Sequence, residues 1–299
     1  MSDELSEIIN QFLGGSTPSS IEEMRTMLDG LGSLLNSDLP EVGALHEAVP
    51  VSEGVTADVV VPEGEGPHPV LVYLHGGGWV CGSPVSHRKL GYRFAEAGFL
   101  VINVDYRMAP EHPFPTPYDD CVQAMRWAHA ECHRFGGDPA RIAVGGDSAG
   151  GNLSAAVAAA LHGEAACPKA ALLIYGVFDF AEMLNAPAEP DAAAEAAAEM
   201  TELMVGAYLG RDGRDALIRD ERVSPLHAAS KLPPSHIVCG MADSLLGQSK
   251  ALKEALEEAG VEHEHFEDPE MPHGYVQMEF LPPARSAVDR MIDFLRRTL

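Results

Sequence analysis

Cysteine is scarce and unpaired in this sequence. The cysteines are odd in number and scattered, with no C-x-x-C pair among the five (Cys81, Cys121, Cys132, Cys167 and Cys239). A disulfide framework needs paired cysteines, and a structural zinc site needs closely spaced ligands. Both are therefore excluded as organising features, and we expect reduced, mostly buried thiols.

Long apolar runs and a basic leader are also missing. No stretch reaches the ~18 apolar residues that span a bilayer. The N-terminus, MSDELSEII, is acidic where a signal peptide is basic, and no apolar segment follows it. We therefore expect a cytoplasmic protein that does not enter the membrane.

Basic residues are outnumbered, because 20 Lys and Arg against 45 Asp and Glu give a formal net charge of −25. Such a charge argues against nucleic acid or an anionic membrane as a partner. The excess fits adaptation to salt or simply a well-solvated surface. The concentration of acidic residues in particular segments favours the second interpretation.

What the chain does contain is an alternation of short apolar runs and helix-length segments. With 299 residues and 46% hydrophobic content, it suits one elaborated α/β domain or two small ones. The stretch from Glu47 to Val61 predicts an antiparallel entry to a sheet. The later runs are typical of buried parallel strands, namely Val70–Leu74, Phe99–Val104, Arg141–Val144, Ala170–Tyr175 and Ser235–Cys239, with Glu262–Phe266 as a last strand. Helices are expected at Val122–Phe135, Gln248–Ala259 and Ala287–Leu299, so the pattern predicts a doubly wound sheet.

Two segments stand outside this alternation. Residues 1–40 predict two amphipathic helices, with Leu5, Ile8, Ile9 and Phe12 on one face and Ile21, Met24, Leu28, Leu31 and Leu35 on another. Ser20 and Glu23 give the second helix a capping-box signature. Residues 181–224 form an Ala/Glu-rich insertion without strand character. We predict that 1–40 and 181–224 form a helical cap on a catalytic domain of residues 41–180 and 225–299. Ordinary core helices are the alternative.

The stretch that ends the Arg141–Val144 strand predicts a nucleophile. Gly146-Asp147-Ser148-Ala149-Gly150 fits the G-x-S-x-G pattern of a strand-to-helix elbow. Small neighbours allow the sharp turn to close. The turn would expose the Ser148 hydroxyl and place the Ala149 amide at a helix N-terminus, where negative charge is favoured. Taken alone, the pattern also fits a plain glycine-rich connection.

Partners for Ser148 follow later strands. A serine nucleophile needs a base and a carboxylate that orients the base, in the chain order Ser, acid, His. Asp243 follows the Ser235–Cys239 strand, and His273 lies in a loop after the last strand. Ligand sites in open parallel sheets lie at that edge. A helix N-cap at Asp243 and a surface histidine at His273 are the alternatives, which the order and placement of the three residues disfavour.

The loop after the Val70–Leu74 strand reads His75-Gly76-Gly77-Gly78-Trp79. Consecutive glycines let bare backbone amides approach a ligand, and acyl transfer needs such donors to hold an oxyanion. We expect His75 and Trp79 to shape this loop and the pocket wall rather than to take part in the chemistry.

HGGGW at 75–79, YRMAPEHPFP at 106–115, GDSAGG at 146–151, Asp243 and His273-Gly274 together resemble the hormone-sensitive-lipase-like (bacterial family IV) carboxylesterases. The resemblance covers about residues 45–180 and 225–299. It implies an α/β-hydrolase fold with a mostly parallel eight-stranded sheet, flanking helices and a helical cap. It also implies Ser148 as nucleophile, His273 as base, Asp243 as orienting acid, an oxyanion hole from the Gly76, Gly77 and Ala149 amides, no cofactor or metal, and a homodimer.

Within the resembling segments, we interpret Arg107, Glu111 and Asp119 as a charge-paired brace under the site. Two departures stand near the acid: Ser244 replaces the family's usual proline, and Leu246-Gly247-Gln248 replaces an Arg-Asp-Glu run. These departures weaken any inference about substrate contacts near that loop.

The residues together predict a serine carboxylesterase that hydrolyses short- to medium-chain carboxylic esters through an acyl-enzyme. An amidase, a lactonase or a deacetylase would use the same triad, so these alternatives stay open. A non-enzymatic small-molecule receptor on this scaffold is disfavoured, because such receptors lack the catalytic histidine and His273 is present here.

Overall fold

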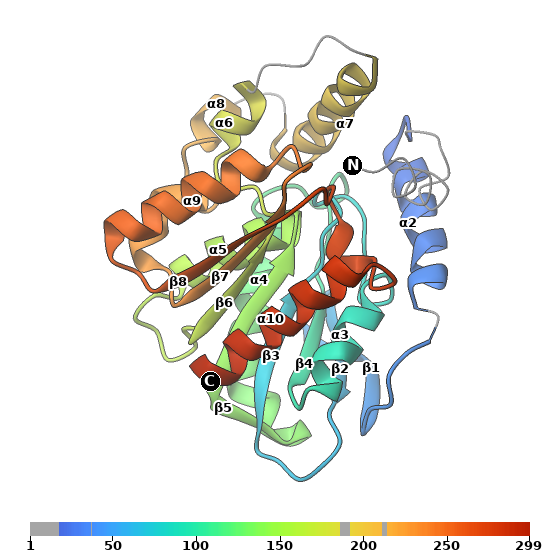
Figure 1. Ribbon diagram of the computed structural model, residues 1–299, viewed down its shortest axis with the longest axis vertical. Helices are drawn as coiled ribbons and strands as arrows, with labels where there is room; N and C mark the ends of the chain where they lie inside the picture. The colour runs from blue at the N-terminus through green and yellow to red at the C-terminus, as the bar shows by residue number, and fades with distance from the viewer. Residues whose placement is uncertain (1–17, 37, 186–191, 211–213) are drawn as a thin grey trace.

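The computed structural model describes residues 18–36, 38–185, 192–210 and 214–299. Its centre is an eight-stranded sheet in the order β1-β2-β4-β3-β5-β6-β7-β8 (Figure 1). The strands are β1 (Ala44–Ser52), β2 (Val55–Val61), β3 (His68–Leu74), β4 (Leu100–Asp105), β5 (Gly137–Asp147), β6 (Ala170–Ile174), β7 (Ser235–Gly240) and β8 (His263–Asp268). From β4 to β8 every neighbouring pair is parallel, and only the pairs of β2 with β1 and with β4 are antiparallel. The predicted mostly parallel, eight-stranded sheet is confirmed.

The stretch from Glu47 to Val61, predicted as an antiparallel entry to the sheet, lies in a hairpin of β1 and β2. Ser52 pairs with Val55, which leaves Glu53 and Gly54 as the turn. Gly54 has φ +75°, a conformation that two-residue hairpin turns need and that glycine adopts without strain. Alternating hydrophobicity continues on both sides of the turn, so the pattern alone did not separate the two strands.

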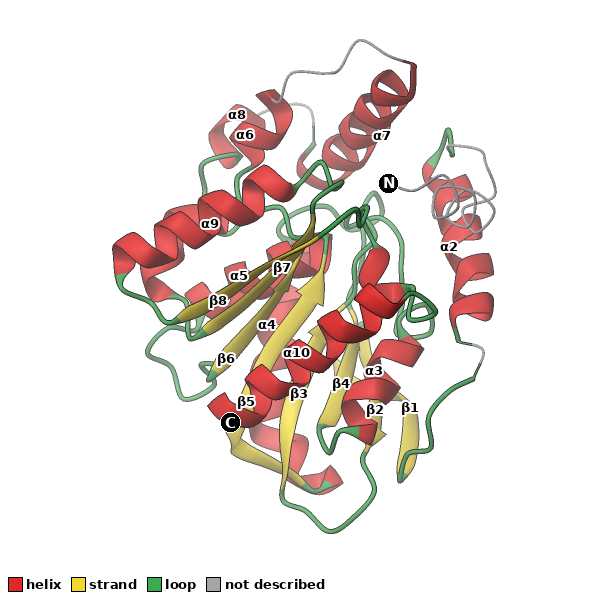
Figure 2. Cartoon of the chain, in the orientation of Figure 1, coloured by secondary structure: helices red, strands yellow, loops and turns green. Residues whose placement is uncertain are grey.

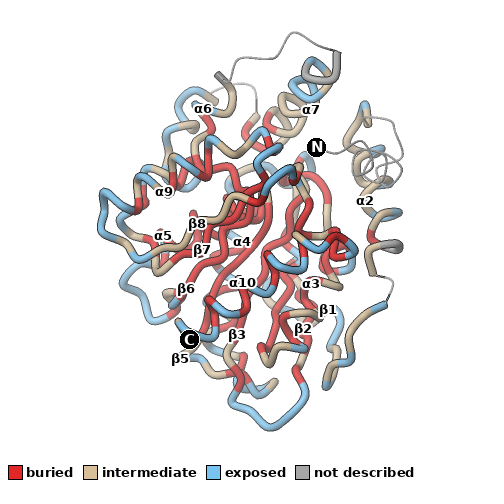
Figure 3. The backbone as a smooth tube through the Cα atoms, viewed as in Figure 1, coloured by how far each residue is buried: buried red, intermediate tan, exposed pale blue. Residues whose placement is uncertain are grey.

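Helices cover both faces of the sheet, as a doubly wound fold requires (Figure 2). Val70, Val72 and Leu74 of β3 pack in one core with α4 (Thr116–Glu131), α5 (Ala149–Ala160) and α9 (Leu246–Ala259). Leu71 and Tyr73 point the other way, into a core with α3 (Arg88–Glu96) and α10 (Pro282–Thr298). The central strands are buried along their length, and exposed residues gather on outer helix faces and turns (Figure 3). The central strands therefore form a rigid base for loops at either end.

Several helices lie beyond one end of the sheet: α2 (Ile21–Leu35), α6 (Phe180–Asn185), α7 (Ala192–Leu209) and α8 (Arg214–Leu217) (Figure 1). The α2 helix has the predicted bounds, whereas the predicted helix around Leu5 to Phe12 lies outside the described residues. Ser20 Oγ accepts the Glu23 amide at 3.2 Å as a capping box requires. The Glu23 carboxylate, however, accepts the amide of Ser19 at 2.7 Å instead of that of Ser20.

Two sequence-based expectations about side chains and membranes can be compared with the structure. The cysteines are all free thiols, and all except Cys167 are buried, as predicted. In the described ranges, no helix is long and apolar enough to cross a membrane.

Candidate active site

Ser148 occupies a strained turn between β5 and α5. Its backbone has φ +53° and ψ −118°, which a non-glycine residue rarely adopts. The Ser148 amide donates to the Ile174 carbonyl at 2.9 Å, and its carbonyl accepts the Asn152 amide at 3.1 Å. A Cβ on Gly150 would lie 2.7 Å from the His75 carbonyl oxygen, so only glycine lets the turn pack this closely against β3. The turn has the geometry of a nucleophile elbow.

The structure brings Ser148, His273 and Asp243 together from the ends of three strands. Ser148 Oγ lies 2.9 Å from His273 Nε2, and His273 Nδ1 lies 2.8 Å from Asp243 Oδ2. The Asp243 side chain is fully buried, while the His273 side chain is 41% exposed. Asp243 Oδ1 also accepts the Leu245 amide at 2.8 Å, which fixes the orientation of the carboxylate. The three side chains form one hydrogen-bonded chain, which runs from the buried Asp243 carboxylate through the His273 imidazole to the Ser148 hydroxyl.

Backbone contacts hold the loops that carry Asp243 and His273 against each other. The Ala242 amide donates to the Met271 carbonyl at 3.1 Å, and the Met241 amide donates to the Asp268 carbonyl at 2.9 Å. Behind the imidazole, the Tyr175 ring meets His273 edge-on with centroids 4.9 Å apart. The acid and the base are thus positioned by β7, β8 and the end of β6 together.

The glycine loop corrects one predicted oxyanion donor. The Gly76 amide already donates to Asp147 Oδ1 at 3.0 Å, so Gly76 is wrong as a donor to substrate. Gly77 and Gly78 have φ +121° and +61°, which aim this stretch of backbone differently from a regular strand. Among the described residues, no acceptor faces the amides of Gly77, Gly78 and Ala149. Gly78, which the sequence reasoning passed over, therefore joins Gly77 and Ala149 as a candidate donor.

Side chains from α7 cover the glycine loop. A Cβ on Gly78 would lie 3.0 Å from Met204 Cγ, so Met204 rests directly on this backbone. Trp79 stacks on Tyr208 of α7 with centroids 4.8 Å apart, and its indole nitrogen donates to Asn152 Oδ1 at 3.3 Å. Trp79 is buried in the core, and its expected part in a pocket wall stays a prediction. Met204 and Tyr208 were not predicted, because the insertion that contains them carries no recognisable motif.

Comparison with known proteins gives the family. A family described as an alpha/beta hydrolase fold matches residues 71–277. The carboxylesterase NlhH of Mycobacterium tuberculosis (strain CDC 1551 / Oshkosh) is 36% identical over 236 residues, which is 77% of this chain and 74% of that protein.

Two solved structures agree. The hyperthermophilic esterase of the archaeon Pyrobaculum calidifontis has a TM-score of 0.89 at 26% identity, covering 99% of this chain and 98% of that one. An esterase from the bacterial hormone-sensitive lipase family has a TM-score of 0.81 at 32% identity, covering 100% of this chain and 99% of that one. The chain belongs to the hormone-sensitive-lipase-like carboxylesterases. It is a carboxylic ester hydrolase with the α/β-hydrolase fold.

The predicted charge-paired brace of this esterase is wrong in its partners. Arg107 binds Asp120 through two nitrogens, at 2.9 and 2.6 Å, while Asp119 is exposed. Successive residues on a helix point about 100° apart, so only Asp120 faces the core side of α4. Glu111 pairs instead with Arg25 of α2 at 2.7 Å. Arg25 also donates to the Val80 carbonyl at 2.8 Å, so it ties α2 to the glycine loop.

Gln248, which departs from the family pattern near Asp243, has a structural role. Gln248 stands where the family usually has a carboxylate, and it is 3% exposed. Its Oε1 accepts the amides of Phe178 and Asp179 at 2.8 and 2.6 Å. An amide side chain can accept these two bonds and still donate, and Gln248 Nε2 donates to Glu182 and to the Asp179 carbonyl. Gln248 thereby fixes the segment that follows β6.

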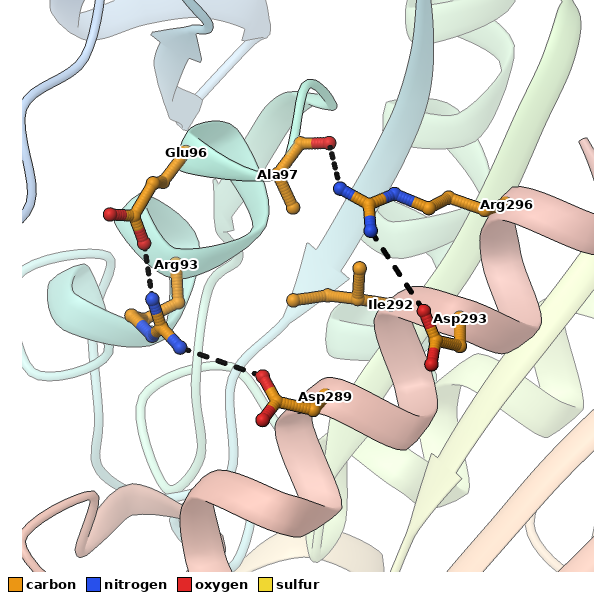
Figure 4. A pocket seen from close by; sticks show the side chains of 7 residues that line it. All are labelled: Arg93, Glu96, Ala97, Asp289, Ile292, Asp293 and Arg296. Carbon is orange, nitrogen blue, oxygen red and sulfur yellow. Dashed lines mark hydrogen bonds and ion pairs between the residues drawn. The ribbon is translucent and has the colours of Figure 1, made fainter.

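A surface hollow between α3 and α10 includes none of the three residues Ser148, His273 and Asp243. Arg93, Glu96 and Ala97 of the α3 segment face Asp289, Ile292, Asp293 and Arg296 of α10 across it (Figure 4). Its arginines are already paired with carboxylates, Arg93 with Glu96 and Asp289, and Arg296 with Asp293. The residues that line this hollow include no nucleophile, so it has no part in the ester site.

We expect the pH dependence of this esterase to follow from His273, the predicted base. Desolvation lowers the pKa of His273, but the adjacent Asp243 carboxylate and the charge of Asp147 outweigh it and raise the pKa above 6.5. A general base must be neutral, so we expect kcat/KM to fall as the pH drops through this pKa, with a midpoint above pH 6.5. The measurement is kcat/KM for p-nitrophenyl butyrate from pH 5 to 9. A flat profile down to pH 5 would contradict His273 as the base.

Proposed function

We propose that the protein hydrolyses carboxylic esters through Ser148, His273 and Asp243. His273 accepts the Ser148 proton as Ser148 Oγ attacks the ester carbonyl. The imidazolium, held by Asp243, then gives that proton to the leaving alcohol. Water, deprotonated by His273, releases the acid from the acyl-enzyme. The observation that carries this proposal is the position of His273, within 2.9 Å of Ser148 Oγ and 2.8 Å of Asp243 Oδ2.

We further propose that the oxyanion is held by the backbone amides of Gly77, Gly78 and Ala149. Ala149 opens α5, so its amide has no acceptor within the helix and lies at the positive end of the helix dipole. The Gly76 amide is excluded because Asp147 already binds it. Each oxyanion donor can lower the activation free energy by about 3 kcal/mol.

We propose that α2 and the helices of residues 181–224 act as the cap. Two contacts support the cap: Arg25 of α2 reaches the Val80 carbonyl, and Met204 of α7 rests on Gly78. A side chain in contact with the oxyanion loop limits the space beside the reacting carbonyl, which favours short acyl groups. Cytoplasmic location, a homodimer and the absence of nucleic-acid partners stay predictions from the sequence.

The test is hydrolysis of p-nitrophenyl esters from acetate to palmitate. We expect kcat/KM to peak between acetate and hexanoate and to fall at longer chains, since Met204 and Tyr208 cover the glycine loop. A peak at long chains would contradict the covered site. Activity on anilides or lactones with none on esters would favour the amidase or lactonase reading instead.

A further inference from the structure

A single buried carboxylate contacts several parts of the proposed site. Asp147 immediately precedes Ser148 and is 5% exposed. The Gly76 amide and the Tyr73 hydroxyl donate to its Oδ1 at 3.0 and 2.9 Å. Gln277 Nε2 donates to Oδ2 at 3.3 Å, and His87 Nε2 lies 3.2 Å from Oδ1. Asp147 is therefore bound from four directions.

The partners of Asp147 come from the segments that carry the rest of the machinery. Tyr73 is on β3, directly before the glycine loop, and Gly76 is in that loop. Gln277 is in the short helix η3 (Tyr275–Gln277), which follows His273. Asp147 thus connects the nucleophile turn to the candidate oxyanion donors on one side and to the base on the other.

Asp147 packs tightly against the backbone of Gly76. A Cβ on Gly76 would lie 2.5 Å from Asp147 Oδ2 and 2.8 Å from the Asp147 carbonyl oxygen. Position 76 therefore needs glycine for contact with Asp147, not for contact with substrate. Gly77 and Gly78 follow Gly76 directly. The hydrogen bond between the Gly76 amide and Asp147 therefore also fixes their position.

Burial by itself raises the pKa of Asp147, but the charge of His87 and hydrogen bonds from His87, Tyr73 and Gln277 hold it well below its usual range. Asp147 is therefore ionised in the folded protein. A buried, paired charge is weak evidence for stability, because apolar side chains of similar volume are often as stabilising. The value of such a network lies in fixing one geometry.

We propose that Asp147 is a positioning residue, which holds the Gly77 and Gly78 amides and the His273 segment in register with Ser148 Oγ. It touches no reacting atom itself. The proposal rests on the proposed function and deepens it.

The decisive variant is Asp147→Asn, which keeps the shape and an acceptor for Gly76 but turns a donor toward Gln277 and removes the charge. We expect kcat for p-nitrophenyl butyrate to fall on the order of 100-fold, because small misplacements of reacting groups cost this much. KM should change less than about threefold, since the substrate still binds.

The acid limb of kcat/KM should also move to lower pH in Asp147→Asn. Asp243, Asp147 and the Tyr175 ring face His273, and of these only Asp147 changes, so His273 loses one nearby negative charge. Tyr73→Phe keeps the charge and should leave the limb in place. A variant that only destabilised the fold would not move the limb.

Asp120→Asn is the matched control, because Asp120 is also a buried, ion-paired carboxylate but contacts Arg107. It should lower Tm without moving the acid limb. Gln277→Met cuts only the connection to the His273 segment, and we expect a kcat loss of about 3- to 10-fold with KM unchanged. If Asp147→Asn does not fold, Gln277→Met tests the positioning role of Asp147 in its place.

Wild-type kcat and an unshifted acid limb in folded Asp147→Asn would overturn the proposal, as would wild-type kcat in Gln277→Met. Failure of the proposed function looks different, since wild type and Ser148→Ala would then have equal activity. Failure of the present proposal leaves that difference intact.

Discussion

Replacing Ser148 with alanine should reduce kcat for p-nitrophenyl butyrate by about 10⁶-fold, the loss typical of removing a serine nucleophile. The fold should survive, because the turn depends on backbone bonds of Ser148 to Ile174 and Asn152, which alanine keeps. Among the described residues, the one side-chain hydrogen bond lost is that to His273. We expect Tm to change by less than about 2 °C, as for substitutions that remove no packing.

Ser154→Ala is the matched control for Ser148→Ala. Ser154 lies on the same helix, α5, and is fully buried, and its Oγ has no hydrogen-bond partner within the described residues. Its loss should leave kcat unchanged. If Ser148→Ala kept more than about 1% of wild-type kcat, another nucleophile would be needed and the proposed mechanism would fail.

Asp243→Asn should lower kcat by about 10⁴-fold with little change in KM. The asparagine can still accept the Leu245 amide, so the loop keeps its shape. Its NH₂ group, however, would face His273 Nδ1 and favour the tautomer that carries the proton on Nε2. That imidazole cannot accept the Ser148 proton, so the loss is chemical and not structural.

Asp179→Asn provides the comparison for Asp243→Asn. Asp179 Oδ1 also accepts the amide two residues ahead, that of Ala181 at 2.8 Å, but Asp179 does not contact His273. Its kcat should stay within about twofold of wild type. A loss of less than tenfold in Asp243→Asn would contradict Asp243 as the residue that orients His273.

The nucleophile elbow could be predicted from the sequence because it restricts only the residues next to Ser148 along the chain. Gly146 and Gly150 flank Ser148 along the chain, and a turn that tight admits only small neighbours. The parallel strands were readable for a similar reason, since a strand buried on both faces must be apolar throughout. Asp243 and His273 followed from the rule that such sheets present functional side chains at one edge.

The errors all involve contacts between distant segments. Gly76, Gly77 and Gly78 are the same residue type, so the sequence does not distinguish their amides. Only the contact with Asp147 shows that the Gly76 amide is already bound. Asp119 and Asp120 are adjacent acids, and only the packing of α4 decides which one meets Arg107.

By itself, the sequence determined the architecture and the three residues proposed for catalysis, because each depends on residue types along a short stretch or on strand order. The tertiary structure alone decided which amides are free, what covers the glycine loop and which charges pair. These depend on side chains brought together across 71 positions, as for Gly76 and Asp147, or 125, as for Ser148 and His273. Such contacts arise from tertiary packing, which no local sequence pattern predicts.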